Sequence, residues 1–99
     1  NNGLQIDGKI EDVCSPYPID EKFRAFNFHV IDVADGNDME QLRQAFAEAR
    51  STKGMPTAII AHTVKGKGVS FMEGKNTWHG KAINDNEYAQ AKAELGGAR

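Results

Sequence analysis

Hydrophobic and polar residues are distributed along the chain in patterns that predict alternating strands and helices. Residues 28–33 and 57–61 are short, β-rich apolar runs of the length expected for buried strands. The second run consists of small and apolar residues, which is typical of a strand covered on both faces in a parallel sheet. Between the two runs, apolar residues recur at helical spacing and predict one apolar helix face: Met39, Leu42, Phe46 and Ala49.

Capping and turn residues predict where this central helix begins and ends. Asp38 can accept a hydrogen bond from the first turn, and Gln41 stands where the return partner of a capping box is expected. Gly54 and Pro56 follow the periodic stretch and end the helix. The helix is therefore expected between these two signals.

Two further helices are predicted in the sequence, one before the first strand and one after the second. Residues 20–26 indicate a short helix that stops at Asn27. A second capping pair, Asn84 and Glu87, begins a last helix that reaches residues 96–97. With these two helices, helices and strands alternate along the chain.

Two loops are predicted besides these elements, one at the start of the chain and one after the second strand. Residues 1–8 contain the turn dipeptides Asn-Gly and Asp-Gly, and residues 63–81 form a long loop rich in glycine and lysine. The order helix–strand–helix–strand–loop–helix predicts an α/β fold with a parallel sheet. We find no internal repeat and no linker, so residues 1–99 are expected to belong to one domain.

Composition excludes several classes of protein. Apolar residues make up 39% of the 99 residues, which suits a globular piece. The net charge of −2 and the lack of a basic helix exclude a general nucleic-acid partner. No apolar run approaches the roughly 18 residues of a membrane helix. Cys14 is the single cysteine, which excludes an internal disulfide and a Cys-rich zinc site and favours a reducing, cytoplasmic setting.

The first loop is a candidate metal site. Residues 1–4 are either an ordinary Asn-Gly surface turn or a metal loop. In a metal loop, an asparagine side-chain oxygen and a backbone carbonyl two residues later would be hard ligands for magnesium or calcium. The chain opens on this loop and does not begin with Met, so we expect further residues upstream.

The second loop holds two more candidates. Residues 64–70 are either a flexible basic loop or a ligand loop at the carboxyl end of a strand, and they lack the spacing of a Walker A sequence. His79 is either a surface histidine beside a packing tryptophan, Trp78, or a group that donates to phosphate or hydroxyl oxygens and exchanges protons near neutral pH.

The other two histidines differ in position. His29 lies inside a predicted strand, which indicates a structural role. His62 ends a predicted strand at the edge of the basic loop, within reach of a ligand there, and the residues alone leave its role open. Ser70 and Cys14 have no partner arrangement that indicates a nucleophile.

Taken together, these segments resemble transketolase over essentially the whole chain. Residues 1–8 look like the end of the family's thiamine diphosphate motif, which runs from Gly-Asp-Gly to a downstream asparagine. Residues 58–68 are similar to the family's strand and following loop, and residues 78–81 match its histidine loop. The run from Lys65 to Gly80 is long enough to be specific, whereas a lone pair of asparagines is not.

The resemblance implies a partial parallel-sheet fold that binds thiamine diphosphate, with residues 1–99 as the C-terminal portion of that domain. It implies that Asn2, through its side chain, and Leu4, through its main-chain carbonyl, bind Mg²⁺ or Ca²⁺. Ile6 would touch the cofactor, and so would His62, where some relatives carry a lysine. His79 would be the catalytic residue, in contact with the diphosphate and a sugar hydroxyl.

The activity implied by the resemblance is transfer of a two-carbon ketol unit from a ketose phosphate to an aldose phosphate, as in the pentose phosphate pathway, with thiamine diphosphate supplying the carbanion chemistry. The implied partners are the remaining transketolase domains or a complementary subunit, in a homodimer or a heterotetramer. Residues 95–99 would suit the end of an N-terminal half-subunit of a split transketolase.

Two parts of the family pattern lie outside this chain. The Gly-Asp-Gly half of the motif, with its metal-binding aspartate, is absent, and so is the glutamate that activates the aminopyrimidine. We therefore expect the chain by itself to be inactive. The alternatives are another thiamine diphosphate enzyme, such as deoxyxylulose-phosphate synthase or dihydroxyacetone synthase, or a non-catalytic α/β interaction domain.

Overall fold

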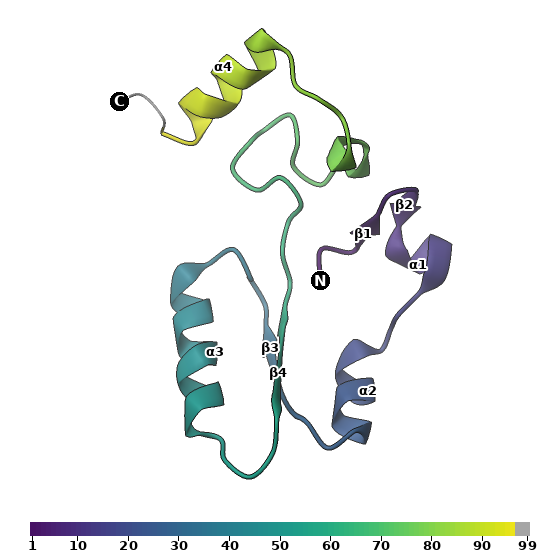
Figure 1. Ribbon diagram of the computed structural model, residues 1–99, viewed down its shortest axis with the longest axis vertical. Helices are drawn as coiled ribbons and strands as arrows, with labels where there is room; N and C mark the ends of the chain where they lie inside the picture. The colour runs from purple at the N-terminus through teal and green to yellow at the C-terminus, as the bar shows by residue number, and fades with distance from the viewer. Residues whose placement is uncertain (97–99) are drawn as a thin grey trace.

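The computed structural model describes residues 1–96, which form helices and two small sheets (Figure 1). In chain order the elements are β1 (Leu4–Gln5), β2 (Gly8–Lys9), α1 (Ile10–Cys14), α2 (Ile19–Ala25), β3 (His29–Val33), α3 (Met39–Ser51), β4 (Thr57–Ala61), the 3₁₀ helix η1 (Asn76–His79) and α4 (Asp85–Glu94). Residues 97–99, where we expected the end of a half-subunit, lie outside the described residues.

The β3–α3–β4 unit is the centre of the fold and confirms the predicted parallel pair. β3 and β4 pair in parallel, in a register that runs from His29 opposite Thr57 to Val33 opposite Ala61. β4 has the predicted bounds, and β3 begins one residue later than predicted. The helices α3 and α2 lie on opposite sides of this pair (Figure 1). The mixed helix and sheet architecture with a parallel sheet is therefore the α/β class that the pattern predicts.

The core lies between α3 and the strands. Ile31, Val33 and Ala45 are its buried residues, and partly buried neighbours pack against them: Leu42, Ala49, Ile59 and Ala61. Side chains alternate between the two faces of a strand, so Asp32, between Ile31 and Val33, points to the other face and is exposed. This alternation decides which strand residues can reach a site on the side of α2.

The predicted apolar face of α3 is only partly buried. Leu42 and Ala49 pack on the core, but Met39 is 69% exposed and Phe46 is 53% exposed. Ala45, which the predicted face did not include, is the buried residue of the helix. The apolar stripe of α3 is wider than a two-stranded sheet can cover, so its margins face outward.

The helix caps follow the predictions at one helix and depart from them at the other. Asn84 Oδ1 accepts from Glu87 N at 2.9 Å and Glu87 Oε2 accepts from Asn84 N at 2.9 Å, which confirms the capping box of α4. Asp38 caps α3 by accepting from Glu40 N at 2.8 Å. Gln41 does not complete a capping box, because its Oε1 accepts from the backbone N–H of Asp35 at 3.0 Å.

Three short elements were not predicted. The first loop folds into an antiparallel hairpin, in which Leu4 pairs with Lys9 and Gln5 with Gly8. The five-residue helix α1 follows it directly, and η1 lies inside the long second loop. α2 was predicted one residue too far along the chain. Elements of two to five residues are shorter than the window in which periodicity can be read.

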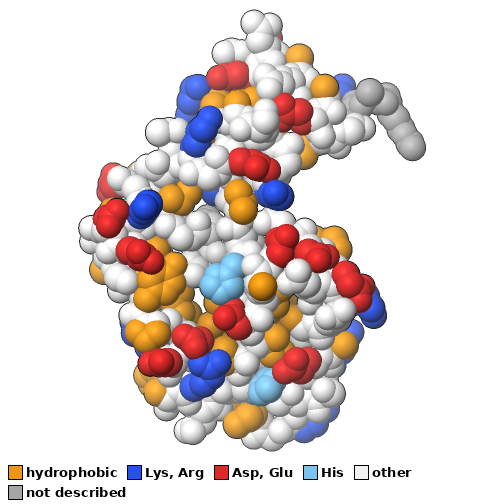
Figure 2. Space-filling model, turned by 180° about the vertical axis from the view of Figure 1, so that it is seen from behind, with side chains coloured by type: hydrophobic (Ala, Val, Ile, Leu, Met, Phe, Trp, Pro, Cys, Tyr) orange, Lys and Arg blue, Asp and Glu red, His pale blue; other side chains and the backbone are white. Residues whose placement is uncertain are grey.

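The described chain is open in shape. Its radius of gyration is 16.7 Å, whereas a compact domain of this length has about 13 Å. Figure 1 shows α4, η1 and the second loop standing beyond the carboxyl ends of β3 and β4. Apolar side chains reach the surface among charged ones (Figure 2), Phe26 at 78% and Leu95 at 64% exposed being examples. Within residues 1–96, every helix falls short of the length and apolar character needed to cross a membrane.

Candidate functional site

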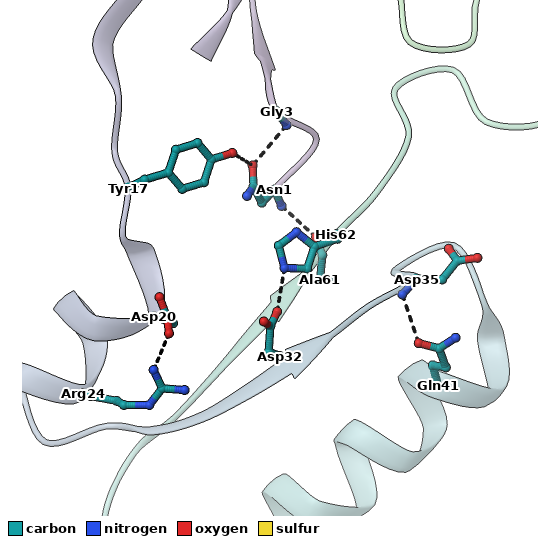
Figure 3. Close-up of polar contacts among 10 residues, drawn as sticks. All are labelled: Asn1, Gly3, Tyr17, Asp20, Arg24, Asp32, Asp35, Gln41, Ala61 and His62. Carbon is teal, nitrogen blue, oxygen red and sulfur yellow. Dashed lines mark hydrogen bonds and ion pairs between the residues drawn. The ribbon is translucent and has the colours of Figure 1, made fainter. Parts of the chain in front are cut away.

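The first residue of the chain is docked at the carboxyl end of β4. The backbone nitrogen of Asn1 donates to the carbonyl of Ala61 at 2.8 Å, and Thr63 N donates to the carbonyl of Asn1 at 2.9 Å (Figure 3 shows the first bond). These two bonds flank His62, whose own backbone bonds to Val33 and Gly36, so Asn1 lies along the edge of β4 that faces away from β3. The loop that contains Asn2 and Leu4 therefore begins beside the carboxyl edge of the parallel sheet, where α/β proteins commonly bind ligands.

A tight turn follows and brings the side-chain oxygen of Asn2 to the Leu4 peptide. Gly3 has a φ of 67°, a left-handed conformation that favours glycine. Asn2 Oδ1 accepts from Leu4 N at 2.9 Å, and the carbonyl of Gly3 accepts from Ile10 N at 2.9 Å. The turn therefore holds the Asn2 side chain and the Leu4 peptide close to each other, with the β1–β2 hairpin as support.

The loop after β4 approaches the turn from the other side. Val64 N donates to Asn37 Oδ1 at 2.8 Å, and Gly74 N donates to the carbonyl of Lys65 at 2.9 Å. Gly66 has a φ of 73°, and a Cβ on it would lie 2.8 Å from the Cβ of Met72. These contacts fold residues 65–74 back on themselves and fix the backbone of Lys65.

Two carboxylates hold the far part of this loop. Glu73 Oε1 accepts from Gly68 N at 2.9 Å, and Glu94 of α4 accepts from both Ser70 N and Ser70 Oγ at 2.6 Å. The hydrogen bond from Gly68 N lowers the pKa of Glu73, and the hydrogen bonds from Ser70 lower the pKa of Glu94. Both groups therefore accept as charged carboxylates at neutral pH.

His79 stands at the end of η1 with an exposed side chain. Trp78 beside it is partly buried: its Nε1 donates to the carbonyl of Phe71 at 3.1 Å, and the two rings lie 5.2 Å apart. Asn76 Nδ2 donates to the carbonyl of Ile6 at 2.9 Å. This bond joins η1 to the β1–β2 hairpin, so that His79 lies near residues that precede it by about seventy positions.

These elements enclose one open cavity of about 370 Å³. Its lining comes from the turn, the hairpin, the second loop and η1: Asn2, Leu4, Gln5, Ile6, Lys65 and His79. Four predicted site residues therefore meet at one place, namely Asn2, Leu4, Ile6 and His79. Lys65 is the one formally charged residue among them at neutral pH, and no carboxylate is among the lining residues. The cavity suits an anionic ligand with an apolar part.

His62 is not part of this cavity. Its Nε2 lies 2.6 Å from Asp32 Oδ1 (Figure 3), and it lines a separate cavity of about 50 Å³. At the end of a strand, His62 projects to the same face as Ile60, toward α2. The structure therefore does not support the predicted cofactor contact of His62, and the lysine that reaches the cavity is Lys65.

Two lining residues were not among the predicted contacts. Lys65 had a usable signal, because it follows a buried strand in a loop that was already a ligand candidate. Gln5 had none, since a single polar residue in a short loop carries no pattern. His29 agrees with its structural interpretation: its Nε2 lies 2.7 Å from Glu48 Oε1 on α3, away from the cavity.

The residues of the cavity fit a diphosphate and its divalent ion. Asn2 Oδ1 spends one lone pair on Leu4 N and keeps a second for a cation. The Lys65 ammonium and the His79 imidazole are donors for phosphate oxygens. Within residues 1–96 no group of three or more His, Cys, Asp or Glu could hold a metal alone. Phosphate oxygens and further protein ligands would have to complete the coordination of a hard cation.

Comparison with known proteins supports this interpretation. Residues 1–98 match the family described as transketolase, thiamine diphosphate-binding domain. The 6-deoxy-6-sulfo-D-fructose transketolase subunit SqwG of Clostridium sp. (strain MSTE9) is 36% identical over 94 residues, which is 95% of this chain and 34% of that subunit. Transketolase 2 of Escherichia coli (strain K12) is 36% identical over 96 residues, which is 97% of this chain and 14% of that enzyme.

The solved structures agree. Transketolase from Leishmania mexicana superposes with a TM-score of 0.85 at 38% sequence identity, over 96% of this chain and 14% of that one. The chain thus spans about a third or less of the proteins that it matches. Because the family match covers nearly every residue, the chain belongs to the transketolase family of thiamine diphosphate-binding domains.

Proposed function

We propose that the chain supplies one wall of a transketolase active site, in which it holds the diphosphate and the divalent ion of thiamine diphosphate. The complete protein would transfer a two-carbon ketol unit from a ketose phosphate to an aldose phosphate. The observation that carries the proposal is the convergence of Asn2, Leu4, Lys65 and His79 on one cavity from separate segments of the chain. The thiamine diphosphate would supply the carbanion chemistry of the transfer.

The residues around the cavity divide this work among them. The side-chain oxygen of Asn2 and the carbonyl of Leu4 would be ligands of Mg²⁺, or of Ca²⁺, since both are hard oxygen donors. The Lys65 ammonium would neutralise diphosphate charge that the metal leaves uncompensated. Ile6, with its side chain 59% exposed at the cavity, would give an apolar contact to the cofactor.

His79 is the proposed catalytic residue. Its side chain is exposed at the cavity and has no packing role in the core. An imidazole there can donate to a diphosphate oxygen or to a sugar hydroxyl, and it can exchange a proton near neutral pH. Trp78 packs against Phe71, and Lys81 Nζ lies 4.0 Å from the centre of the indole ring. These contacts restrain the backbone of η1, which carries His79.

The rest of the active site would come from other parts of the complete protein. The glutamate that activates the aminopyrimidine and the aspartate that completes the metal site are not in these residues. We propose that the remaining transketolase domains or a complementary subunit provide them, in a homodimer or a heterotetramer. Three relatives are named as transketolase subunits, which supports a complementary subunit as partner. The cytoplasmic location and the place in the pentose phosphate pathway stay predictions.

The sugar itself is not proposed from this chain. Relatives with the same identity of 36% are named for 6-deoxy-6-sulfo-D-fructose and for apulose-4-phosphate. A thiamine diphosphate enzyme of another specificity remains the alternative, and turnover assays on several sugar phosphates decide between them.

Calorimetry on the complete protein tests the proposal. Thiamine diphosphate is titrated with Mg²⁺ present and again with excess EDTA, and binding is expected only with the metal. Lys65→Ala is expected to weaken binding by about 2 kcal/mol, roughly thirtyfold, because a hydrogen bond to a charged group is lost. Lys53→Ala, in the loop between α3 and β4, is the matched control and should bind as the wild type does. Equal binding by Lys65→Ala and wild type contradicts the assignment of the cavity.

A second titration uses residues 1–99 alone. We expect no tight binding, because the metal site is incomplete and nothing holds the aminopyrimidine. A dissociation constant in the micromolar range with Mg²⁺ present would contradict this expectation.

A further inference from the structure

The side chain of Asn1 makes contacts that the proposed function does not use. Asn1 Oδ1 accepts from Gly3 N at 3.1 Å and from the Tyr17 hydroxyl at 3.0 Å, in a partly buried position (Figure 3). The backbone of Asn1 is bonded on both sides to the end of β4. Asn1 and Tyr17 line the small cavity beside His62, and neither of them lines the 370 Å³ cavity of the proposed cofactor site.

The hydrogen bond to Gly3 lies at a decisive point of the turn. Gly3 stands between Asn2 and Leu4, so the orientation of its two peptides decides where the proposed oxygen ligands point. Its φ of 67° belongs to a region that a glycine can leave easily, because many other backbone conformations cost it little. An external contact that fixes the Gly3 N–H therefore has a strong effect on the two ligands.

Tyr17 determines the orientation of the Asn1 side chain. A carbonyl oxygen has two lone pairs, and here one serves Gly3 N and the other serves the Tyr17 hydroxyl. Tyr17 is itself held between α1 and α2, where its N–H donates to Ser15 Oγ at 3.3 Å and its carbonyl accepts from Lys22 Nζ at 3.3 Å. Without the hydroxyl, the amide of Asn1 loses the contact that keeps its oxygen toward the turn.

We propose that Asn1 and Tyr17 are positioning residues that set the geometry of the oxygen pair of Asn2 and Leu4. The pair of positioning residues connects the α1–α2 segment and the edge of β4 to the turn, and it acts on the divalent ion only through that turn. The inference rests on the proposed function of the cavity lined by Asn2, Leu4, Lys65 and His79. It differs from a role in folding, because it concerns the affinity for the ion.

The test is the Mg²⁺ dependence of thiamine diphosphate binding to the complete protein, measured by calorimetry. Tyr17→Phe removes one hydroxyl and is expected to raise the apparent dissociation constant for Mg²⁺ by roughly three- to tenfold. Asn1→Leu removes both accepted bonds and is expected to raise it by roughly tenfold or more. Asn1→Asp keeps the accepting oxygen and is expected to bind Mg²⁺ at least as tightly as the wild type.

Tyr88→Phe is the matched control. Tyr88 is the other tyrosine of the chain, it is 56% exposed on α4, and its hydroxyl has no hydrogen-bond partner within residues 1–96. The melting temperature of each variant without ligand separates positioning from folding. A purely structural role would lower the melting temperature of Tyr17→Phe and leave its Mg²⁺ constant within twofold of the wild type, which overturns the inference.

Failure of the proposed function can be distinguished from failure of the inference on Asn1 and Tyr17. If the wild type shows no Mg²⁺-dependent binding of thiamine diphosphate, the proposed function fails, and the inference fails with it. If the wild type binds and Tyr17→Phe has an unchanged Mg²⁺ constant, only the inference fails. Should Asn1→Leu not fold, Tyr17→Phe and Asn1→Asp still decide the question.

Discussion

The β3–α3–β4 unit and the second loop, residues 63–81, are held together by different interactions. The unit buries Ile31, Val33 and Ala45 between a helix and two paired strands. The loop has one buried apolar residue, Val69, and relies on hydrogen bonds to the carboxylates of Glu73 and Glu94.

This difference separates stability from function in the molecule. Burial is nondirectional and tolerates small displacements, so it stabilises the unit without specifying the position of any polar atom. Hydrogen bonds are directional: those to Glu73 and Glu94 set the backbone at Gly68 and Ser70, and the bond from Gly74 N to the Lys65 carbonyl sets the backbone that carries Lys65. We therefore expect substitutions of buried residues in the unit to change stability, and substitutions of the exposed polar residues of the loop to change ligand binding and turnover.

The largest expected effect is on turnover. In the complete enzyme, His79→Ala is expected to reduce turnover by about a hundredfold, roughly 2.7 kcal/mol, because a positioned donor to developing charge is lost. Its free energy of unfolding should change by less than about 0.5 kcal/mol, since the side chain is exposed. Steady-state kinetics and denaturant unfolding measure the two quantities.

Trp78→Ala is the adjacent comparison and should behave in the opposite sense. It loses the packing on Phe71 and the contact with Lys81, so stability should fall more than turnover does. If His79→Ala melts much earlier and keeps near-normal turnover, His79 is structural and the functional interpretation of the loop is wrong.

The next largest effect is expected on the free energy of unfolding when a core residue is truncated. Ile31→Ala is expected to lower the free energy of unfolding of the complete protein by about 2 to 3 kcal/mol, because it leaves a cavity between β3 and α3. The dissociation constant for thiamine diphosphate should stay within twofold, since Ile31 does not line the proposed cofactor cavity. Val13→Ala, at a position 48% exposed on α1, should cost less than about 0.5 kcal/mol. A large loss of cofactor affinity in folded Ile31→Ala would break the separation of the two regions.

A smaller effect is expected on the local stability of the second loop when the pH is lowered. The folded-state pKa values of Glu73 and Glu94 are lowered, so their contribution to the loop is fully present above the ordinary carboxyl pKa of 4.5 and is lost as the pH falls through the lowered values. Glu94→Gln should weaken this acid dependence. The readout is amide hydrogen exchange at Ser70, at pH values on either side of that range.

Glu11→Gln on α1 is the control for the acid experiment, because the Glu11 carboxylate has no hydrogen-bond or ion-pair partner within residues 1–96. In the Glu11→Gln variant, amide hydrogen exchange at Ser70 should depend on pH as it does in the wild type. Identical acid dependence in Glu94→Gln and the wild type would show that α4 does not hold the loop.

The smallest effect is expected at an exposed ion pair of the unit. Arg43 and Glu40 on α3 lie 2.7 Å apart, with side chains 70% and 55% exposed. Arg43→Ala should leave the melting temperature and the cofactor affinity unchanged within error, because solvent weakens such pairs. A clear drop in melting temperature would show that polar contacts also stabilise the unit, which would weaken the contrast with the loop.

The sequence predicted the parts of the fold that repeat a pattern. The parallel strands, the central helix and the capping box of α4 each involve a periodic run or a fixed spacing, and the structure confirms them. Elements without such a pattern, namely the β1–β2 hairpin, α1 and η1, were not predicted. Their formation depends on contacts such as Asn76 with the carbonyl of Ile6, which no local signal reveals.

What the sequence determined by itself was the chemistry: an asparagine and a carbonyl two residues apart, a basic loop after a buried strand, and a histidine beside a tryptophan. Only the tertiary structure decided which of these residues meet. It placed Lys65 at the cavity and turned His62 to Asp32, because strand alternation and the bonds of residues 62–65 orient the two side chains differently. Residue types carry donors, acceptors and charge along the chain, whereas their convergence depends on backbone pairing between segments far apart in sequence, which no local pattern encodes.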